Sequence, residues 1–278
     1  MKKCVHILVL FLMPLVVICS CTIQTPDIHE QDIEEIMEED IEGEREIFKT
    51  NLIASEQGLI TEMLDATLYD IDLVIPDNFE QLDGHQLVIY TNQEEISLEK
   101  IYFRMFPNTS GDNLVVSNVF INGEYVQPIV EFANSAIRVD FIEPLAPAES
   151  IKIEMDFTVK IPPEMGGNYG LFGYFEDVLV LDQFFPIIPV YDDEGWNVEV
   201  PLRNGDMVYN DAAFFLVKVT ANEDLVIAAS GVQVAGEEVD GKQVATFAAG
   251  PGRDFYLAAS ADFVITSQQL GETLVSSY

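Results

Sequence analysis

The sequence predicts an all-β fold: an antiparallel β-sandwich preceded by a short helical or disordered N-terminal extension. Three observations predict it: an alternation of period two, turn dipeptides between the alternating runs, and many short strands spaced about ten residues apart. The alternation is clearest over residues 151–161, where every odd position is apolar and most even positions are charged or polar. This pattern indicates a strand with one buried face and one solvated face.

Further strands are expected over residues 69–75 and 136–141, which alternate in the same way. The dipeptides Asp83-Gly84, Asn122-Gly123 and Asp240-Gly241 each lie between two strand-like segments. Asp-Gly and Asn-Gly favour tight hairpins because both central residues of such a turn need a positive φ. The sequence therefore predicts three tight hairpins.

Residues 1–20 have the layout of a signal peptide. Lys2 and Lys3 precede an apolar run from Val5 to Ile18, which is short for a membrane span. The following Ile18-Cys19-Ser20-Cys21 resembles the lipobox of bacterial lipoproteins. That resemblance implies cleavage after Ser20, a lipid on Cys21, and a place in the bacterial cell envelope. The alternatives are an ordinary secretory signal with an incidental cysteine, or a single membrane helix.

Composition limits the partners of the mature chain. Cys4, Cys19 and Cys21 are the only cysteines, so cleavage would leave no disulfide and no thiolate metal site. Loss of Lys2 and Lys3 moves the formal net charge from −35 to −37. Such a chain is not expected to bind nucleic acid, and anionic lipids would repel it. The protein is therefore expected to be held at the membrane by two acyl chains alone.

Residues 21–47 form an acidic segment in which eleven carboxylates face one base, Arg45. Like-charge runs of this kind are typically solvated, so we expect a tether; calcium binding is the alternative, although calcium-loop spacing is absent. A regular helix is expected over residues 46–64, with an apolar stripe. The stripe comprises Phe48, Leu52, Ile60 and Leu64. The folded domain is assigned to residues 48–278.

Catalytic chemistry is not apparent in the sequence. The mature part has two histidines, His29 and His85, and no H-E-x-x-H motif. A zinc enzyme usually needs three protein ligands, so no metal ligand and no catalytic residue is assigned. His85 is interpreted as a surface strand residue. The acidic run 192–194 beside the single tryptophan, Trp196, indicates either a ligand groove or a surface turn with an anchoring ring.

Six short motifs in order resemble the N-terminal domain of zinc aminopeptidases typified by aminopeptidase N. The motifs are Thr67–Leu73, Leu82-Asp83-Gly84 with Tyr90-Thr91-Asn92, Leu98–Asn108, Val119–Gly123, Pro144–Pro147 with Ala148 where glycine is usual, and Phe185-Pro186 through Trp196 to Tyr209. This resemblance implies a saddle-like β-sandwich that packs against a separate catalytic domain. That domain would carry the zinc and act on peptide substrates, and its motifs are absent here.

The resemblance leaves two functions open. The chain is either a non-catalytic fragment of a lipid-anchored aminopeptidase-like protein, or a stand-alone surface lipoprotein that binds a peptide, a glycan or a protein. By resemblance, Gln183 contacts the free amine of a substrate, while Phe185 stands where the family has a glutamate. If a catalytic domain is missing, the stretch with Phe184, Phe185, Ile187, Ile188 and Trp196 should form an exposed apolar face.

Overall fold

The structure is a computed structural model that describes residues 45–164, 172–200, 209–271 and 273–278. Every described residue belongs to one compact unit. The predicted signal peptide, Cys21 and all but residues 45–47 of the predicted tether lie outside the described residues. These assignments and the domain boundary at residue 48 remain predictions.

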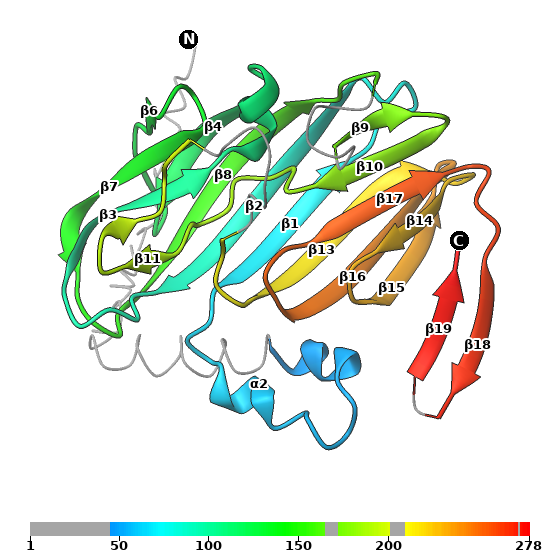
Figure 1. Ribbon diagram of the computed structural model, residues 1–278, viewed down its shortest axis with the longest axis horizontal. Coiled ribbons are helices and arrows are strands. Elements are labelled where there is room, and N and C mark those ends of the chain that lie inside the picture. The colour runs from blue at the N-terminus through cyan, green and yellow to red at the C-terminus, as the bar shows by residue number, and fades with distance from the viewer. Residues whose placement is uncertain (1–44, 165–171, 201–208, 272) are drawn as a thin grey trace, which may run out of the picture. The chain divides into compact units, whose positions relative to one another are not determined.

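The expected all-β sandwich is confirmed, and its largest layer is an eight-stranded sheet (Figure 1). The strand order is β15-β16-β13-β1-β2-β8-β4-β5. Their bounds are β1 Leu68–Val74, β2 Gln81–Thr91, β4 Leu114–Ile121, β5 Glu124–Tyr125, β8 Ser150–Lys160, β13 Ala213–Asn222, β15 Val232–Val239 and β16 Lys242–Gly252. Neighbours are antiparallel except β1 and β13, which are parallel, with Leu68 beside Phe214.

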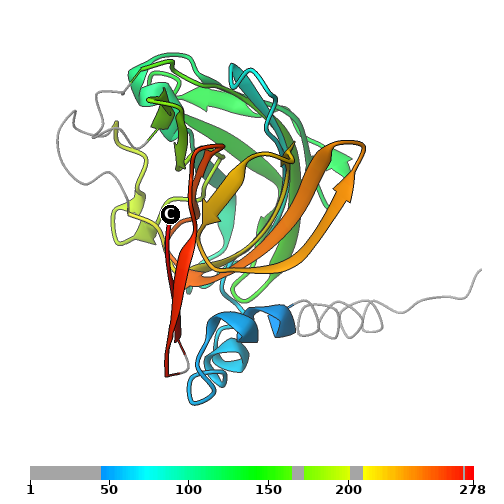
Figure 2. The same cartoon turned by 90° about the vertical axis from the view of Figure 1, so that its right-hand side faces the viewer.

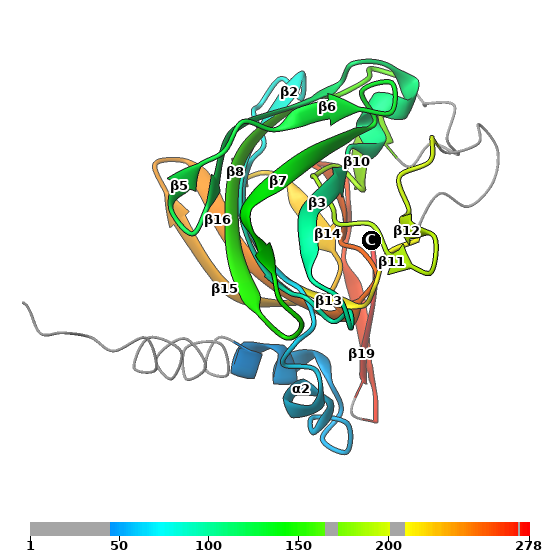
Figure 3. The same ribbon diagram turned by 90° about the vertical axis from the view of Figure 1, so that its left-hand side faces the viewer.

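Two smaller sheets complete the sandwich. Their strands are β9 Phe172–Phe175, β10 Val178–Asp182, β14 Val226–Ala229 and β17 Tyr256–Ser260 in one sheet, and β3 Leu98–Arg104, β6 Ile129–Glu131 and β7 Ala136–Leu145 in the other. Two hairpins stand apart, β11 Tyr191–Asp192 with β12 Gly195–Trp196, and β18 Thr266–Leu270 with β19 Thr273–Ser277. Figures 2 and 3 show the large sheet curving around the smaller ones, and one apolar core contains side chains from all three.

The alternating run that predicted the fold is β8. Its residues alternate between buried and half-buried from Ser150 to Val159, with Ile153, Met155 and Phe157 in the core. The strand pairs with β2 on one side and β4 on the other, so its polar positions face outward from a central strand. The predicted strands over 69–75 and 136–141 are confirmed as β1 and β7.

Two of the three predicted hairpins are confirmed. Asn122-Gly123 joins β4 to β5 with φ values of 48° and 83°, and Asp240-Gly241 joins β15 to β16 with 53° and 76°. The prediction of a hairpin at Asp83-Gly84 is wrong, because both residues lie inside β2. Gly84 pairs with Phe157 of β8, and a Cβ atom on Gly84 would lie 2.1 Å from Cζ of that ring. The glycine therefore makes room for a core aromatic side chain.

The single helix expected over residues 46–64 is also wrong. The segment forms a 3-10 helix, η1 Glu46–Asn51, and one α-helical turn, α2 Leu59–Glu62, with turns between them. Phe48 and Ile60 are buried together against Leu68, Ile89 and Phe214, on the side of the large sheet opposite the main core. Packing of two anchor side chains onto the sheet, rather than a continuous helical stripe, fixes this segment.

The stretch expected to form an exposed apolar face is instead buried. Phe184, Phe185, Ile187 and Ile188 are at most 7% exposed and belong to the domain's own core. The ring of Phe185 packs edge-on against Tyr69 at a centroid distance of 5.8 Å. The expected apolar interface is therefore not at this stretch, and Phe184 and Phe185 are packing residues of the core.

A buried amide organises the chain after β3. Asn108 lies in the 3-10 helix η2 (Phe106–Ser110) and is 7% exposed. Its Nδ2 donates to the carbonyl oxygens of Leu114 and Asn134 at 2.9 Å each, and its Oδ1 accepts from the Leu114 N–H at 2.6 Å. One side chain thus satisfies backbone groups of two other segments, which buried polar groups require.

Candidate functional site: an aromatic recess with two carboxylates

Gln183, the one predicted binding residue within the described chain, is largely a structural side chain. It follows β10 with a φ of 50° and is 4% exposed. Its Nε2 donates to Asp254 Oδ2 at 3.2 Å, and its Oε1 has no partner among the described residues. Gln183 does not line the recess discussed below, so its contact with a substrate amine remains a prediction.

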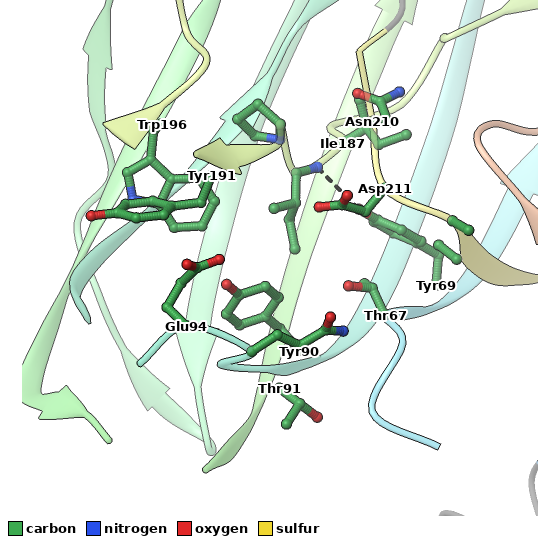
Figure 4. A pocket seen from close by; sticks show the side chains of 15 residues that line it. Thr67, Tyr69, Tyr90, Thr91, Glu94, Ile187, Tyr191, Trp196, Asn210 and Asp211 are labelled. Atoms are coloured by element: carbon green, nitrogen blue, oxygen red, sulfur yellow. Dashed lines mark hydrogen bonds between the residues drawn. The ribbon is translucent and has the colours of Figure 1, made fainter. Parts of the chain in front are cut away.

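One feature that could bind a ligand is a cavity of about 200 Å³, here called the aromatic recess (Figure 4). It lies where the start of β1, the end of β2 and the start of β13 meet the β11–β12 hairpin. Its position follows from the topology, because β1 pairs antiparallel with β2 and parallel with β13. Those pairings place Thr67, Tyr90 and Asp211 at one end of the large sheet although they are distant in sequence.

Aromatic rings form much of the wall of the recess. Tyr191 and Trp196 come from the hairpin, with ring centroids 5.1 Å apart in an edge arrangement. Tyr90 comes from β2 and lies 6.2 Å from Trp196. Tyr69 of β1 is fully buried behind them, and its hydroxyl accepts a hydrogen bond from the Ile188 N–H at 3.0 Å. Burial raises the pKa of the Tyr69 and Tyr90 hydroxyls, so both remain neutral at physiological pH.

The hairpin that carries two of these rings is fixed by local hydrogen bonds. Asp192 accepts from the Asn197 side chain at 2.7 Å and from the Glu194 N–H at 2.9 Å. These two donors lower the pKa of the Asp192 carboxyl. Arg104, at 5% exposure, donates from Nη1 to the Glu199 carbonyl at 2.7 Å, and burial lowers its pKa to about 10. The rings therefore sit on a pre-formed support.

Two carboxylates face this space. Glu94 is half-buried in the turn after β2, and Asp211 lies at the mouth just before β13. Figure 4 shows the Glu94 carboxylate beside the Tyr90 hydroxyl, with Asp211 on the side of the recess nearer Tyr69 and Asn210. Asp211 keeps solvent contact, but crowding by the surrounding protein desolvates it and raises its pKa, which the charge of Arg253 partly opposes. The recess is thus aromatic and negatively charged.

Metal chemistry finds no support in the described part of the chain. No group of three or more His, Cys, Asp or Glu side chains that could hold a metal ion is found there. His85 is an exposed β2 residue whose Nδ1 lies 2.8 Å from Asp156 Oδ1, as expected of a surface strand position. No described helix is long and apolar enough to cross a membrane. The absence of zinc and of activity remains a prediction.

Sequence reasoning locates only part of the recess. The run 192–196 stands out for its acids beside Trp196. The structure shows a hairpin whose Tyr191 and Trp196 rings line the recess, and the interpretation as a ligand groove remains a prediction. Glu94 and Asp211 were not identified from the sequence as residues of a binding site. With 48 acidic residues in the chain, nothing local distinguishes them. Both residues lie next to strand ends, but only the strand order of the folded sheet makes those strand ends neighbours.

Solved structures similar to this chain include zinc peptidases. A mutant two-domain M1 zinc metallopeptidase bound to L-arginine matches with a TM-score of 0.51 and 20% identity, covering 76% of this chain and 46% of that chain. The M1 zinc metallopeptidase from Deinococcus radiodurans and a mutant of it cover the same shares with TM-scores of 0.49 and 0.47, at 18% and 20% identity.

The first of these matches confirms the resemblance to aminopeptidase N-type zinc peptidases at the level of the fold. This chain spans less than half of the length of those peptidases. No protein family model matches the sequence. No curated protein matches it either.

Proposed function

We propose that this chain is the non-catalytic N-terminal domain of an extracytoplasmic, lipid-anchored protein of the zinc aminopeptidase type. The fold supports the proposal: it aligns with 46% of a two-domain zinc peptidase. The zinc domain would lie beyond this sequence and would hydrolyse N-terminal residues from peptides through zinc-bound water. The role of this chain would be to shape one side of the substrate cleft, and Cys21 would anchor the whole protein to a membrane.

The distribution of exposed apolar side chains supports a partner domain near the β18–β19 hairpin. Six large hydrophobic residues between positions 264 and 278 are exposed, and Val264 reaches 77%. Nothing in β18 or β19 is buried, and the two strands pair only with each other. An isolated two-stranded hairpin is marginal in water. A neighbouring domain resting on this hairpin would cover its apolar side chains.

The nucleotides downstream of codon 278 provide the direct test. An open frame that soon encodes H-E-x-x-H supports the proposal, and a stop codon there contradicts it. The purified chain as given should also hold less than one zinc per molecule and leave aminoacyl anilides intact, since three zinc ligands are not found together in its described part. Stoichiometric zinc in a tag-free sample, measured by elemental analysis, would contradict the assignment as non-catalytic.

One observation favours a second candidate, a stand-alone surface lipoprotein that binds a ligand through its β-sandwich. The aromatic recess is a concave site with convergent polar groups, and every residue that lines it lies in this chain. A binding module needs no further domain to use such a site. A stop codon after residue 278, together with ligand binding by the isolated chain, would favour this candidate.

A further inference from the structure

We propose that the aromatic recess binds an organic cation, specifically the primary ammonium group of a small alkylamine or of a ligand that presents one. The inference concerns a site within this chain and holds whether or not the chain belongs to a peptidase. It rests on the charge of the lining, on the aromatic walls and on a buried acceptor.

Both described charged residues that line the recess are acidic. They are Glu94 and Asp211, and no lysine, arginine or histidine among the described residues lines it. Neither carboxylate accepts a hydrogen bond from another described side chain, and the one base that acts on Asp211 is Arg253. Beside the recess, Glu95, Asp193 and Glu194 line an adjoining depression that shares Tyr191. Two carboxylates with one opposing guanidinium nearby leave a net negative charge, which attracts a cation and repels an anion.

The walls select an organic cation. Tyr90, Tyr191 and Trp196 present three rings to one small space. The face of an aromatic ring attracts an ammonium group, and tryptophan does so most strongly. A strongly hydrated metal ion would need several oxygen ligands in place of its water, and no such cluster is found among the described residues. The apolar stem of an alkylammonium ion can instead contact the rings while its charged end meets the carboxylates.

A buried acceptor favours a cation that carries N–H donors. Asn210 also lines the recess and is 2% exposed. Its Nδ2 donates to the Arg253 carbonyl at 3.2 Å, but its Oδ1 has no donor in the part of the chain that is described. Unsatisfied buried acceptors are rare and costly. An ammonium group, directly or through a water molecule, would supply the missing donor, which a quaternary ammonium ion cannot do.

The chain contains a single tryptophan, Trp196, and it lines the recess, so its fluorescence responds to binding there. Titration of the purified full chain with n-butylammonium should give a saturating change in emission. The dissociation constant should be on the order of 1 mM, as befits a ligand of five heavy atoms. The neutral isostere 1-butanol should give no saturating change over the same range. A linear response, or an equal response to both compounds, overturns the proposal without recourse to any variant.

Matched variants separate the recess from the general attraction of an acidic chain for cations. The double variant Glu94→Gln with Asp211→Asn should weaken n-butylammonium binding about tenfold. The control Glu237→Gln with Glu238→Gln removes the same charge from exposed positions of β15 and should leave the affinity unchanged. Equal affinity in the recess variant, with circular dichroism like that of the parent, would refute the assignment.

Discussion

Replacement of Gly84 by alanine tests the geometry in which the sequence-based prediction and the structure disagree. The new Cβ would lie 2.1–2.6 Å from three ring carbons of Phe157, although carbon atoms normally approach to about 3.5–4.0 Å. Phe157 is 1% exposed and packed in the main core, so its ring cannot swing into solvent. Overpacking of this kind costs about 1–3 kcal/mol.

A smaller effect acts in the opposite direction. Alanine restricts the unfolded chain and stabilises the protein by about 0.4–1 kcal/mol where the native backbone accepts it. Gly84 lies in regular strand β2, so its backbone accepts alanine. The clash outweighs this gain, and the net destabilisation expected for Gly84→Ala is about 1–2 kcal/mol. For a folded unit of this size the unfolding midpoint should fall by roughly 2–8 °C.

The measurement is a double-mutant cycle by urea denaturation, followed by far-ultraviolet circular dichroism. In a Phe157→Leu background the smaller side chain frees space, so Gly84→Ala should cost less than about 0.5 kcal/mol or become stabilising. Gly123→Ala is the control, because Gly123 has a φ of 83° and open space around its Cβ position. Its cost should be identical in both backgrounds. An equal cost of Gly84→Ala in both backgrounds would mean that backbone strain in a turn, rather than the ring of Phe157, requires this glycine.

Three further expectations concern other parts of the chain. Asn108→Ala should lower the free energy of unfolding by about 2–4 kcal/mol, since it leaves three backbone groups without partners, and an unchanged urea midpoint would contradict this. Asp211→Asn should raise the melting temperature at pH 7, because the pKa of Asp211 is raised in the folded state and its ionised form therefore destabilises the fold above the pKa of the unfolded chain. The gain in melting temperature should vanish below about pH 3.8, and a gain that persists there would point to a cause other than titration. Cys21→Ser should release the protein from membrane fractions, because it removes the thiol that would carry the lipid, whereas retention with an uncleaved mass would indicate a membrane helix.

Local chemistry was sufficient for much of the fold. The alternation over residues 151–161 specifies one buried face at any position in a sheet, and it appears as the central strand β8. Asn122-Gly123 and Asp240-Gly241 form hairpin turns because few other residues accept positive φ at two successive positions. Asp83-Gly84 is the same dipeptide as Asp240-Gly241, but its glycine is needed for close contact with Phe157, a residue more than seventy positions away.

Burial of apolar residues without a clear period could not be assigned from the sequence. The stretch containing Phe184, Phe185, Ile187 and Ile188 is apolar whether it faces a second domain or its own core, and hydrophobic burial has no direction of its own. The structure places it inside, against Tyr69 and Phe215. A similar ambiguity affected residues 46–64, where Phe48 and Ile60 pack on the sheet without a continuous helix.

The sequence by itself determined the fold class, the period of its strands, two of its turns and the strongly acidic character of the chain. Only the tertiary structure decided where the aromatic recess lies. Tyr90, Glu94, Trp196 and Asp211 come together because β1 lies between β2 and β13 and pairs with β13 in parallel. A parallel pairing joins segments far apart in the chain, and no local pattern of residues encodes which distant strand will be the neighbour.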